Sequence, residues 1–407
     1  MMKKGAMEMS TSTVKEVKTI KTLNNIAASG LNVFKKGNYT MDDTSNNPDA
    51  ILLRSFNMHG LELGDKLKAI ARAGAGVNNI PVEQCTAQGI VVFNTPGANA
   101  NAVKEMVLMS LMASSRNLFE GVSWTKTIAT EGDQVPKLVE AGKKQFVGHE
   151  IKGKTLGVIG LGAIGALVAN DALALDMDVI GYDPFLSVDT AWNLSRNVQR
   201  AMTLEQLFAE SDYITVHVPL TEDTKGMFNK QAFDFMKPGT QILNFSRGEL
   251  VNEIDMAVAL EEGRIGRYIT DFPNENVLQM KNTIAIPHLG ASTEESEENC
   301  AVMAARQVKD FLETGNIKNS VNFPNASIPY TGKRRVTAFH LNVPNMVGQI
   351  TQVISTYQLN IADMVNRSRG DYAYTMIDID NQVADHIIPL LSQQLKGIDG
   401  IVTMRVI

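Results

Sequence analysis

The sequence predicts an α/β protein with two doubly wound parallel-sheet domains, followed by a small ferredoxin-like module at the C-terminus. Three observations support this prediction. Short apolar runs alternate with polar, helix-like segments over residues 17–95. A regular alternation of strands and helices begins at Lys154, and such alternation favours a parallel, doubly wound sheet. Residues 335–407 read as strand, helix, strand, strand, helix, strand, which is the order of a split β-α-β unit.

The bulk properties are those of a globular protein with more than one domain. A chain of 407 residues exceeds what one hydrophobic core usually organises. The net charge of -6, without a dense run of lysine and arginine, gives no support to nucleic-acid binding. No window approaches about 18 consecutive apolar residues, and the stretch Met1–Lys21 lacks the apolar segment of a signal peptide. We therefore expect a cytoplasmic protein without a membrane partner.

The two cysteines, Cys85 and Cys300, lie far apart and have no CxxC spacing. This pattern predicts neither a disulfide framework nor a zinc site, and no metal is expected. We expect both thiols to be reduced and structural.

The expected elements follow the apolar pattern along the chain. In the first domain the expected strands are Val17–Leu23, Ala50–Leu53, Leu67–Ala71 and Ile90–Phe93. A long helix is expected over residues 99–120, and residues 122–150 are expected to form a surface connection. In the second domain the expected strands are Thr155–Ile159, Asp178–Tyr182, Tyr213–Val218, Gln241–Phe245 and Tyr268–Asp271.

Residues 318–333 are rich in Asn, Pro and Gly and predict a linker or extended arm. The module after it is expected to contain Arg335–Val343, Met346–Tyr357, Ile361–Asn366, Ala373–Ile379, Ala384–Leu395 and Ile401–Val406. The predicted domains are 1–97 with 291–325 for substrate binding, 98–290 for the cofactor, a linker over 326–334, and a regulatory module over 335–407.

A glycine motif marks the cofactor site. Gly160, Gly162 and Gly165 form GxGxxG directly after a strand and at the head of the predicted helix Ala163–Leu175. The glycines permit a tight turn, close approach to a pyrophosphate and close helix packing, while the helix N-terminus supplies free N–H groups. Asp183 follows the next strand, where a carboxylate accepts both ribose hydroxyls and repels a 2′-phosphate. The motif predicts a Rossmann domain that binds NAD rather than NADP.

Four further motifs extend this pattern. They are VHVPLT at Val216–Thr221, NFSRG at Asn244–Gly248, TDFP at Thr270–Pro273 and PHLGAST at Pro287–Thr293. With the glycine motif, they resemble the D-2-hydroxyacid dehydrogenase family in order and spacing, over nearly the whole chain. The resemblance implies a hydride transfer between a 2-hydroxy acid and NAD.

The resemblance also implies a catalytic set. His288 matches the family's base, whose pKa suits proton transfer near pH 7. Arg247 matches the residue whose planar fork binds a carboxylate. The family's glutamate falls five residues after the aspartate that matches Asp271, where Asn276 stands here. Glu275 stands one residue earlier, so a loop shortened by one residue would bring it into that role.

The cofactor contacts implied by the resemblance cover the ends of several strands. They are Gly160, Gly162, Ala163, Ile164, Gly165, Asp183, Val218, Pro219, Phe245, Ser246, Arg247, Asp271, His288 and Gly290. The site is expected between the substrate and cofactor domains.

The implied substrate residues are Arg54, Ser55, Gly74, Ala75, Gly76 and Arg247. The loop at Gly74–Gly76 resembles the one whose amides hold the substrate carboxylate. Arg54 and Ser55 match the segment that approaches a substrate phosphate, with Lys126 as a further cation. Arg54 is equally compatible with a surface cation at a strand end.

Within the family, the chain resembles the branch that oxidises 3-phospho-D-glycerate to 3-phosphooxypyruvate with NAD, the first step of L-serine biosynthesis. Two alternatives remain. One is a D-2-hydroxyacid dehydrogenase acting on 2-hydroxyglutarate or lactate, and the other is a non-catalytic NAD-sensing regulator.

The C-terminal module resembles an ACT domain, an amino-acid sensor. His340, Asn342 and Asn360 match the positions that contact serine in serine-inhibited members, so L-serine is the expected effector. Pro344-Asn345 stands where the family usually has Pro-Gly. A purely structural role in dimerisation is the alternative, and a homodimer or homotetramer is expected.

Overall fold

The computed structural model describes residues 16–380 and 382–407 and divides the chain into two compact units. The first unit combines Met1–Ala98 with Glu297–Ile407, and the second is Asn99–Ser296. Most of the stretch examined for a signal peptide lies outside the described residues. Among the described residues, no helix is long and apolar enough to cross a membrane. The three-domain division and its boundaries stay a prediction.

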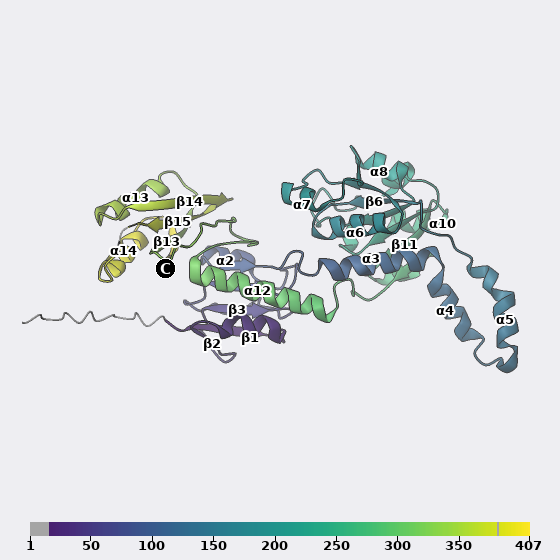
Figure 1. The fold of residues 1–407 in the computed structure, drawn as a ribbon, viewed down its shortest axis with the longest axis horizontal. Coiled ribbons are helices and arrows are strands. Elements are labelled where there is room, and N and C mark those ends of the chain that lie inside the picture. Colours follow the sequence, from purple (N-terminus) through teal and green to yellow (C-terminus); the bar gives the residue numbers. More distant parts are fainter. Residues whose placement is uncertain (1–15, 381) are drawn as a thin grey trace, which may run out of the picture. The chain divides into compact units, whose positions relative to one another are not determined.

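The first unit contains a five-stranded parallel sheet in the order β2-β1-β3-β4-β5 (Figure 1). All four strands expected from the sequence are present. The additional edge strand β2 is only three residues long and has no apolar run to reveal it. The strands are β1 (Lys18–Leu23), β2 (Tyr39–Met41), β3 (Ala50–Leu53), β4 (Ala69–Arg72) and β5 (Val91–Phe93).

Both faces of this sheet are covered, which explains the uninterrupted apolar strands β3 and β5. Side chains alternate along a strand, so Ala50 and Leu52 pack in the cluster that contains the long helix α12 (Glu294–Thr314). Ile51 and Leu53 pack on the opposite face, in the cluster that includes Cys85 of α2 (Val82–Ala87). The two helices thus cover opposite faces.

The second unit contains a seven-stranded parallel sheet in the order β12-β11-β10-β9-β6-β7-β8. Strand order reverses at β6, where the chain first moves outward to β7 and β8 and then returns to β9 on the other side. This is the doubly wound arrangement whose ligands bind at the carboxyl ends of the central strands. The predicted fold class is therefore confirmed. The strands are β6 (Thr155–Ile159), β7 (Asp178–Tyr182), β8 (Gln199–Arg200), β9 (Tyr213–Val216), β10 (Thr240–Asn244), β11 (Ile265–Thr270) and β12 (Thr283–Ala285).

Several helices beside these strands begin at polar caps, whereas α6 has no side-chain cap. The side chains of Thr203, Asn229 and Asn252 accept hydrogen bonds from the first turns of α8, α9 and α10. The bounds are α6 (Ala163–Ala174), α7 (Val188–Asn193), α8 (Leu204–Glu210), α9 (Lys230–Phe235), α10 (Glu253–Glu261) and α11 (Glu275–Gln279).

One sequence prediction is wrong in the segment that precedes this sheet. The helix expected over 99–120 is broken at Asn117, whose φ of 49° is left-handed, into α3 (Ala100–Ser115) and α4 (Leu118–Thr127). The connection expected over 122–150 does lie at the surface, with most of its residues exposed, and it is largely helical, with α5 at Val135–Gly142. The ring of Trp124 in α4 packs 5.3 Å from that of Phe146, which lies in the short turn after α5. This contact holds the two ends of the segment together.

The C-terminal residues form an antiparallel sheet in the order β14-β15-β13-β16. This is the predicted ferredoxin-like topology. Asn345 has a φ of 66°, so it adopts the left-handed conformation that glycine usually provides before the first helix. The elements are β13 (Arg335–Leu341), α13 (Met346–Thr356), β14 (Ile361–Arg369), β15 (Tyr372–Ile379), α14 (Ile387–Lys396) and β16 (Ile401–Val406).

The two faces of this sheet have different neighbours. Ile350 of α13 and Leu391 of α14 belong to the apolar cluster on one face. Phe339 and Tyr374, on the other face, belong to the cluster that contains Phe311 of α12. The C-terminal module is therefore packed on the five-stranded sheet's helix layer within the same unit.

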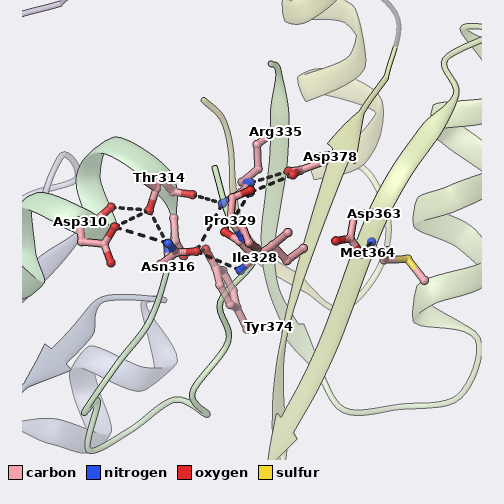
Figure 2. A network of polar contacts seen from close by, with 11 residues as sticks. Asp310, Thr314, Asn316, Ile328, Pro329, Arg335, Asp363, Met364, Tyr374 and Asp378 are labelled. Carbon is pink, nitrogen blue, oxygen red and sulfur yellow. Dashed lines mark hydrogen bonds and ion pairs between the residues drawn. The ribbon is translucent and has the colours of Figure 1, made fainter. Parts of the chain in front are cut away.

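The arm before the module is held by specific contacts rather than being a loose linker. The side chain of Asn322 accepts from Val92 N and donates to Ile90 O, both at 2.9 Å. Arg335 is fully buried at the end of the arm and pairs with Asp378 (Figure 2). It also donates to the carbonyl oxygens of Thr314 at 2.8 Å and Ile328 at 3.3 Å. One arginine thus connects α12, the arm and the module.

Candidate active site

The turn between β6 and α6 requires glycine at two positions. Gly160 has a φ of +85°, and a Cβ atom there would lie 2.6 Å from the carbonyl oxygen of His217. A Cβ at Gly165 would lie 1.9 Å from the carbonyl oxygen of Gly160. These contacts are far below van der Waals distance, so the strand, the turn and the helix approach each other only because both residues lack a side chain.

The N-terminus of α6 is suited to an anion. No side chain caps it, and a Cβ at Gly162 would meet no atom within 4 Å. The first helical N–H groups, beginning with Ala163 and Ile164, therefore face open space that a pyrophosphate can enter. This local geometry fits a dinucleotide.

Asp183 follows β7 and is fixed by the same turn. Its Oδ2 atom accepts from Leu161 N at 2.9 Å, and its Oδ1 atom accepts from Phe185 N at 2.8 Å. Each carboxylate oxygen keeps a further lone pair, as ribose hydroxyl donors would need.

The carboxyl ends of β9 and β10 are joined by side-chain hydrogen bonds. Ser246 Oγ donates to Val216 O at 2.7 Å. The buried side chain of Asn244 donates to Arg247 O at 2.8 Å and accepts from Ser246 N at 3.1 Å. Asn244 therefore fixes the backbone from which the exposed Arg247 side chain extends. Val218, Pro219 and the buried Phe245 belong to the same two strand ends.

A hollow of about 630 Å³ opens beside the ends of β10 and β11. His288 lines it, and its imidazole packs against the Phe272 ring with the ring centres 4.8 Å apart. Gly248, Glu253 and Asp271 are among the other lining residues. The hollow, which Glu249 lines as well, thus brings a base, three carboxylates and an aromatic surface together within the second unit.

Asp271 is the buried acid of this hollow. Its Oδ2 atom accepts from Gly290 N at 2.9 Å, while Oδ1 is buried without a hydrogen-bond partner. Burial raises the pKa of the Asp271 carboxyl, against the opposing effects of the Gly290 N–H and the cationic forms of His288 and Arg247. The unpaired oxygen is thus enclosed within the protein, in a residue that lines the hollow.

The position of Glu275 differs from that of a second acid, Glu253. Glu275 is exposed at the start of α11, and among the described residues no hydrogen bond or ion pair joins it to His288. Glu253, at the start of α10, lines the hollow with His288 and accepts from Asn274 at 2.6 Å and Asn276 at 2.9 Å. The role of Glu275 stays a prediction.

Sequence reasoning missed Glu253, Asn244 and Phe272. A signal for Glu253 was present, because it begins the helix that follows the Arg247–Gly248 motif at the carboxyl edge of the sheet.

The expected substrate residues of the first unit lie after neighbouring strands. Arg54 and Ser55 follow β3, and Gly74–Gly76 follow β4, which pairs with β3 in parallel. Arg72 Nε donates to Arg54 O at 2.9 Å and ties the two loops together. The Arg54 guanidinium makes an ion pair with Glu297 at 2.7 Å, and both side chains are 44% exposed. Lys126 belongs to the second unit, near the end of α4, and is exposed.

The expected effector residues do not share one environment. His340 is buried, and its two ring nitrogens contact Leu341 O at 2.7 Å and Thr375 Oγ1 at 2.8 Å. Asn342 is exposed and donates to Gly370 O at 3.1 Å. Asn360 is exposed, and its carbonyl oxygen accepts from Asp380 N at 2.8 Å. The hydrogen-bonding capacity of His340 is thus used inside the module.

Comparisons with known proteins agree with this arrangement. Residues 108–290 match the NAD-binding domain of the D-isomer-specific 2-hydroxyacid dehydrogenases, which confirms NAD as the expected cofactor. A relative from Haemophilus influenzae, named D-3-phosphoglycerate dehydrogenase, is 31% identical over 362 residues, covering 85% of this chain and 83% of the relative. A relative of the same name from Synechocystis is 39% identical over 285 residues, covering 68% of this chain and 49% of the relative.

The chain spans about half the length of the first curated relatives it matches. Among solved structures, the NAD⁺-bound 3-phosphoglycerate dehydrogenase of Entamoeba histolytica is similar with a TM-score of 0.59 and 28% identity. That match covers 75% of this chain and 99% of the other. The chain belongs to the D-isomer-specific 2-hydroxyacid dehydrogenase family.

Proposed function

We propose that the protein oxidises 3-phospho-D-glycerate to 3-phosphooxypyruvate with NAD, the first step of L-serine biosynthesis. The observation that carries this proposal is the similarity to the Haemophilus influenzae relative, which extends over 85% of this chain. The local geometry of the second unit supports it, because the GxGxxG turn, Arg247 and His288 all lie at the carboxyl edge of one sheet.

The proposed roles follow from the chemistry of each group. The GxGxxG turn and Asp183 would hold NAD, which would supply the acceptor for the hydride from C2 of the substrate. His288 accepts the C2 hydroxyl proton, and Phe272 packs against its imidazole. Arg247 binds the substrate carboxylate, and Asn244 positions the Arg247 backbone. Either Glu275 or Glu253 supports the protonated imidazole.

In this proposal the Arg54 guanidinium binds the substrate phosphate in place of the Glu297 carboxylate. Its guanidinium already pairs with Glu297, so a phosphate dianion must replace one carboxylate. An exposed pair of this kind contributes only about 0–1 kcal/mol, which makes the exchange inexpensive. Ser55 and the amides of Gly74, Ala75 and Gly76 bind neighbouring parts of the substrate.

A substrate panel tests the assignment. NADH formation is measured with 3-phospho-D-glycerate, D-glycerate, D-2-hydroxyglutarate and D-lactate, with the keto product removed chemically. We expect kcat/KM to be highest for the phosphorylated acid, and Arg54→Met to reduce that preference at least tenfold. Lys66→Met, which removes an exposed lysine of the same unit, serves as the control. An equal rate with D-lactate or D-2-hydroxyglutarate would support one of the alternative dehydrogenases.

We further propose that L-serine binds the C-terminal module and inhibits the enzyme. Asn342 and Asn360 supply exposed amides, and His340 positions the backbone at Leu341. Calorimetry with millimolar L-serine on the full chain tests this, with Asn342→Ala as the weakened variant. Absence of binding heat would leave the module with a structural role.

We also propose that the protein forms a homodimer or homotetramer and is located in the cytoplasm. Light scattering on the purified chain measures the first property, and fractionation of cells measures the second. A monomer at micromolar concentration would remove the assembly part of the proposal.

A further inference from the structure

A pocket of about 260 Å³ lies in the first unit, away from every residue discussed for substrate or serine. Three elements supply its polar lining: Lys18 from β1, Ser392 and Lys396 from α14, and Arg405 from β16. Leu312 of α12 supplies part of the apolar lining. The pocket therefore joins the C-terminal module to the five-stranded sheet and its long helix.

Three cationic side chains, those of Lys18, Lys396 and Arg405, line the pocket, and Ile407, the last residue of the sequence, lines it as well. Among the described residues, no carboxylate lies within ion-pair distance of Lys18, Lys396 or Arg405. Lys18 Nζ donates to Leu312 O at 2.5 Å, and Arg405 Nη2 donates to Phe311 O at 3.1 Å. These carbonyls belong to the last turn of α12, so the two cations stabilise its C-terminal end.

That capping role does not use the full bonding capacity of either cation. An ammonium group has three donors and a guanidinium has five. Lys396 and Ser392 make no described contact with the helix end at all, yet they line the same pocket. The Arg405 guanidinium also lies 4.1 Å from the centre of the Phe311 ring. Lys18, Ser392, Lys396 and Arg405 thus line one space of the size of a small molecule.

The electrostatic environment of Lys18 supports the same interpretation. Burial, followed by the nearby charges of Arg405 and Lys68, lowers the pKa of Lys18 to about 8, while Asp49 and Glu313 act in the opposite direction. Burial also lowers the pKa of Arg405. Lys68 is itself paired with Asp49, so that carboxylate is shared among several cations. An anion in the pocket would relieve this unfavourable arrangement.

We propose that this pocket binds the phosphate group of a small phosphorylated metabolite. A phosphate dianion matches the planar fork of Arg405, the point charges of Lys18 and Lys396, and the hydroxyl of Ser392. A ligand held by β1 on one side and by α14 and β16 on the other stabilises the packing of the module. The inference does not depend on the proposed dehydrogenase activity.

The first experiment measures pyrophosphate binding by calorimetry at constant ionic strength, on the full chain. We expect saturable binding that Lys396→Met and Arg405→Met each weaken at least tenfold. Lys137→Met, an exposed lysine of the second unit, and Arg54→Met are the matched controls and should bind as the unmodified protein does. Loss of binding only in Arg54→Met would overturn the proposal, because it would place the anion in the candidate active site.

Lys396 is exposed, so its variant keeps the test informative even if Arg405→Met fails to fold.

A second measurement is specific to the pocket. The ε-¹³C resonance of Lys18, assigned by its absence in Lys18→Arg, is titrated with and without pyrophosphate. We expect pyrophosphate to raise the pKa of Lys18 by at least one unit. The affinity of the pocket for pyrophosphate should fall above pH 8. An unchanged Lys18 resonance, or equal affinity for malonate, would refute a phosphate site here.

Discussion

Arg335→Met removes the cation that connects α12, the arm and the C-terminal module (Figure 2). Arg335 is 0% exposed and the Asp378 side chain is 8% exposed, so the substitution leaves a carboxylate buried without its partner. It also removes the donors that satisfy Thr314 O, Ile328 O and Pro329 O. Breaking a buried pair of this kind costs about 3–5 kcal/mol.

The neighbouring ion pair provides a matched control. Arg334 pairs with Asp385 at 2.9 Å, with side chains 37% and 73% exposed. Arg334→Met should therefore cost at most about 1 kcal/mol. The first unit has about 200 residues, so a loss of 3–5 kcal/mol lowers its Tm by roughly 6–20 °C.

Urea unfolding and thermal scans of both variants measure the difference. Arg335→Met/Asp378→Leu should recover much of the loss, because it removes both buried charges together. If Arg335→Met and Arg334→Met reduced the free energy of unfolding equally, the buried pair would not hold the module in place.

Three further predictions concern single positions. Gly165→Ala should lower the free energy of unfolding by about 1–3 kcal/mol and abolish NAD binding, because its Cβ would meet Gly160 O. Gly162→Ala should weaken NAD binding but lower the free energy of unfolding by less than about 1 kcal/mol. Equal losses of stability in the two variants would contradict the geometry of the turn. Burial lowers the pKa of His217 from 6.5 to about 3, so the unfolded chain takes up a proton between pH 7 and 5 that the native state does not. The free energy of unfolding should fall by about 2 kcal/mol over that range, and His217→Gln should remove this part of the fall in urea titrations at the two pH values. Burial raises the pKa of Cys85 to about 12, so a thiol reagent at pH 8 should label it only after denaturation; rapid labelling of the native protein would show that the site is open.

The central strands could be predicted because buried strands appear in the sequence as short apolar runs. Thr155–Ile159 and Asp178–Tyr182 have the bounds expected from their apolar runs, since parallel strands covered on both faces show no polar alternation. Tyr39–Met41 lacks this signal because it is a short edge strand with largely exposed residues.

Features that depend on tertiary contact could not be predicted from local pattern. Trp124 in α4 packs on Phe146 in the turn that follows α5, and no local pattern indicates that these two residues meet. Asn345 occupies a left-handed conformation that the sequence signals only weakly, since asparagine tolerates it less readily than glycine.

In the candidate site, too, features set by local spacing were predictable and features set by tertiary contact were not. The glycine turn was predictable because its chemistry follows from spacing, and Asp183 because it follows the next strand. The position of Glu253 after the Arg247–Gly248 motif was a signal, but its contacts were not predictable, because its neighbours Asn274 and Asn276 follow a different strand, β11, and meet it only in the folded sheet.

The most direct test of the proposed function is the initial rate of NADH formation from 3-phospho-D-glycerate, compared among the unmodified chain, His288→Asn and Arg247→Met. We predict NADH formation by the unmodified chain and a fall in kcat of about 10²–10⁴-fold for His288→Asn, the usual contribution of a positioned base. Arg247→Met should mainly raise KM. Undiminished NADH formation by His288→Asn, or NAD binding without any turnover in the unmodified chain, would contradict the account.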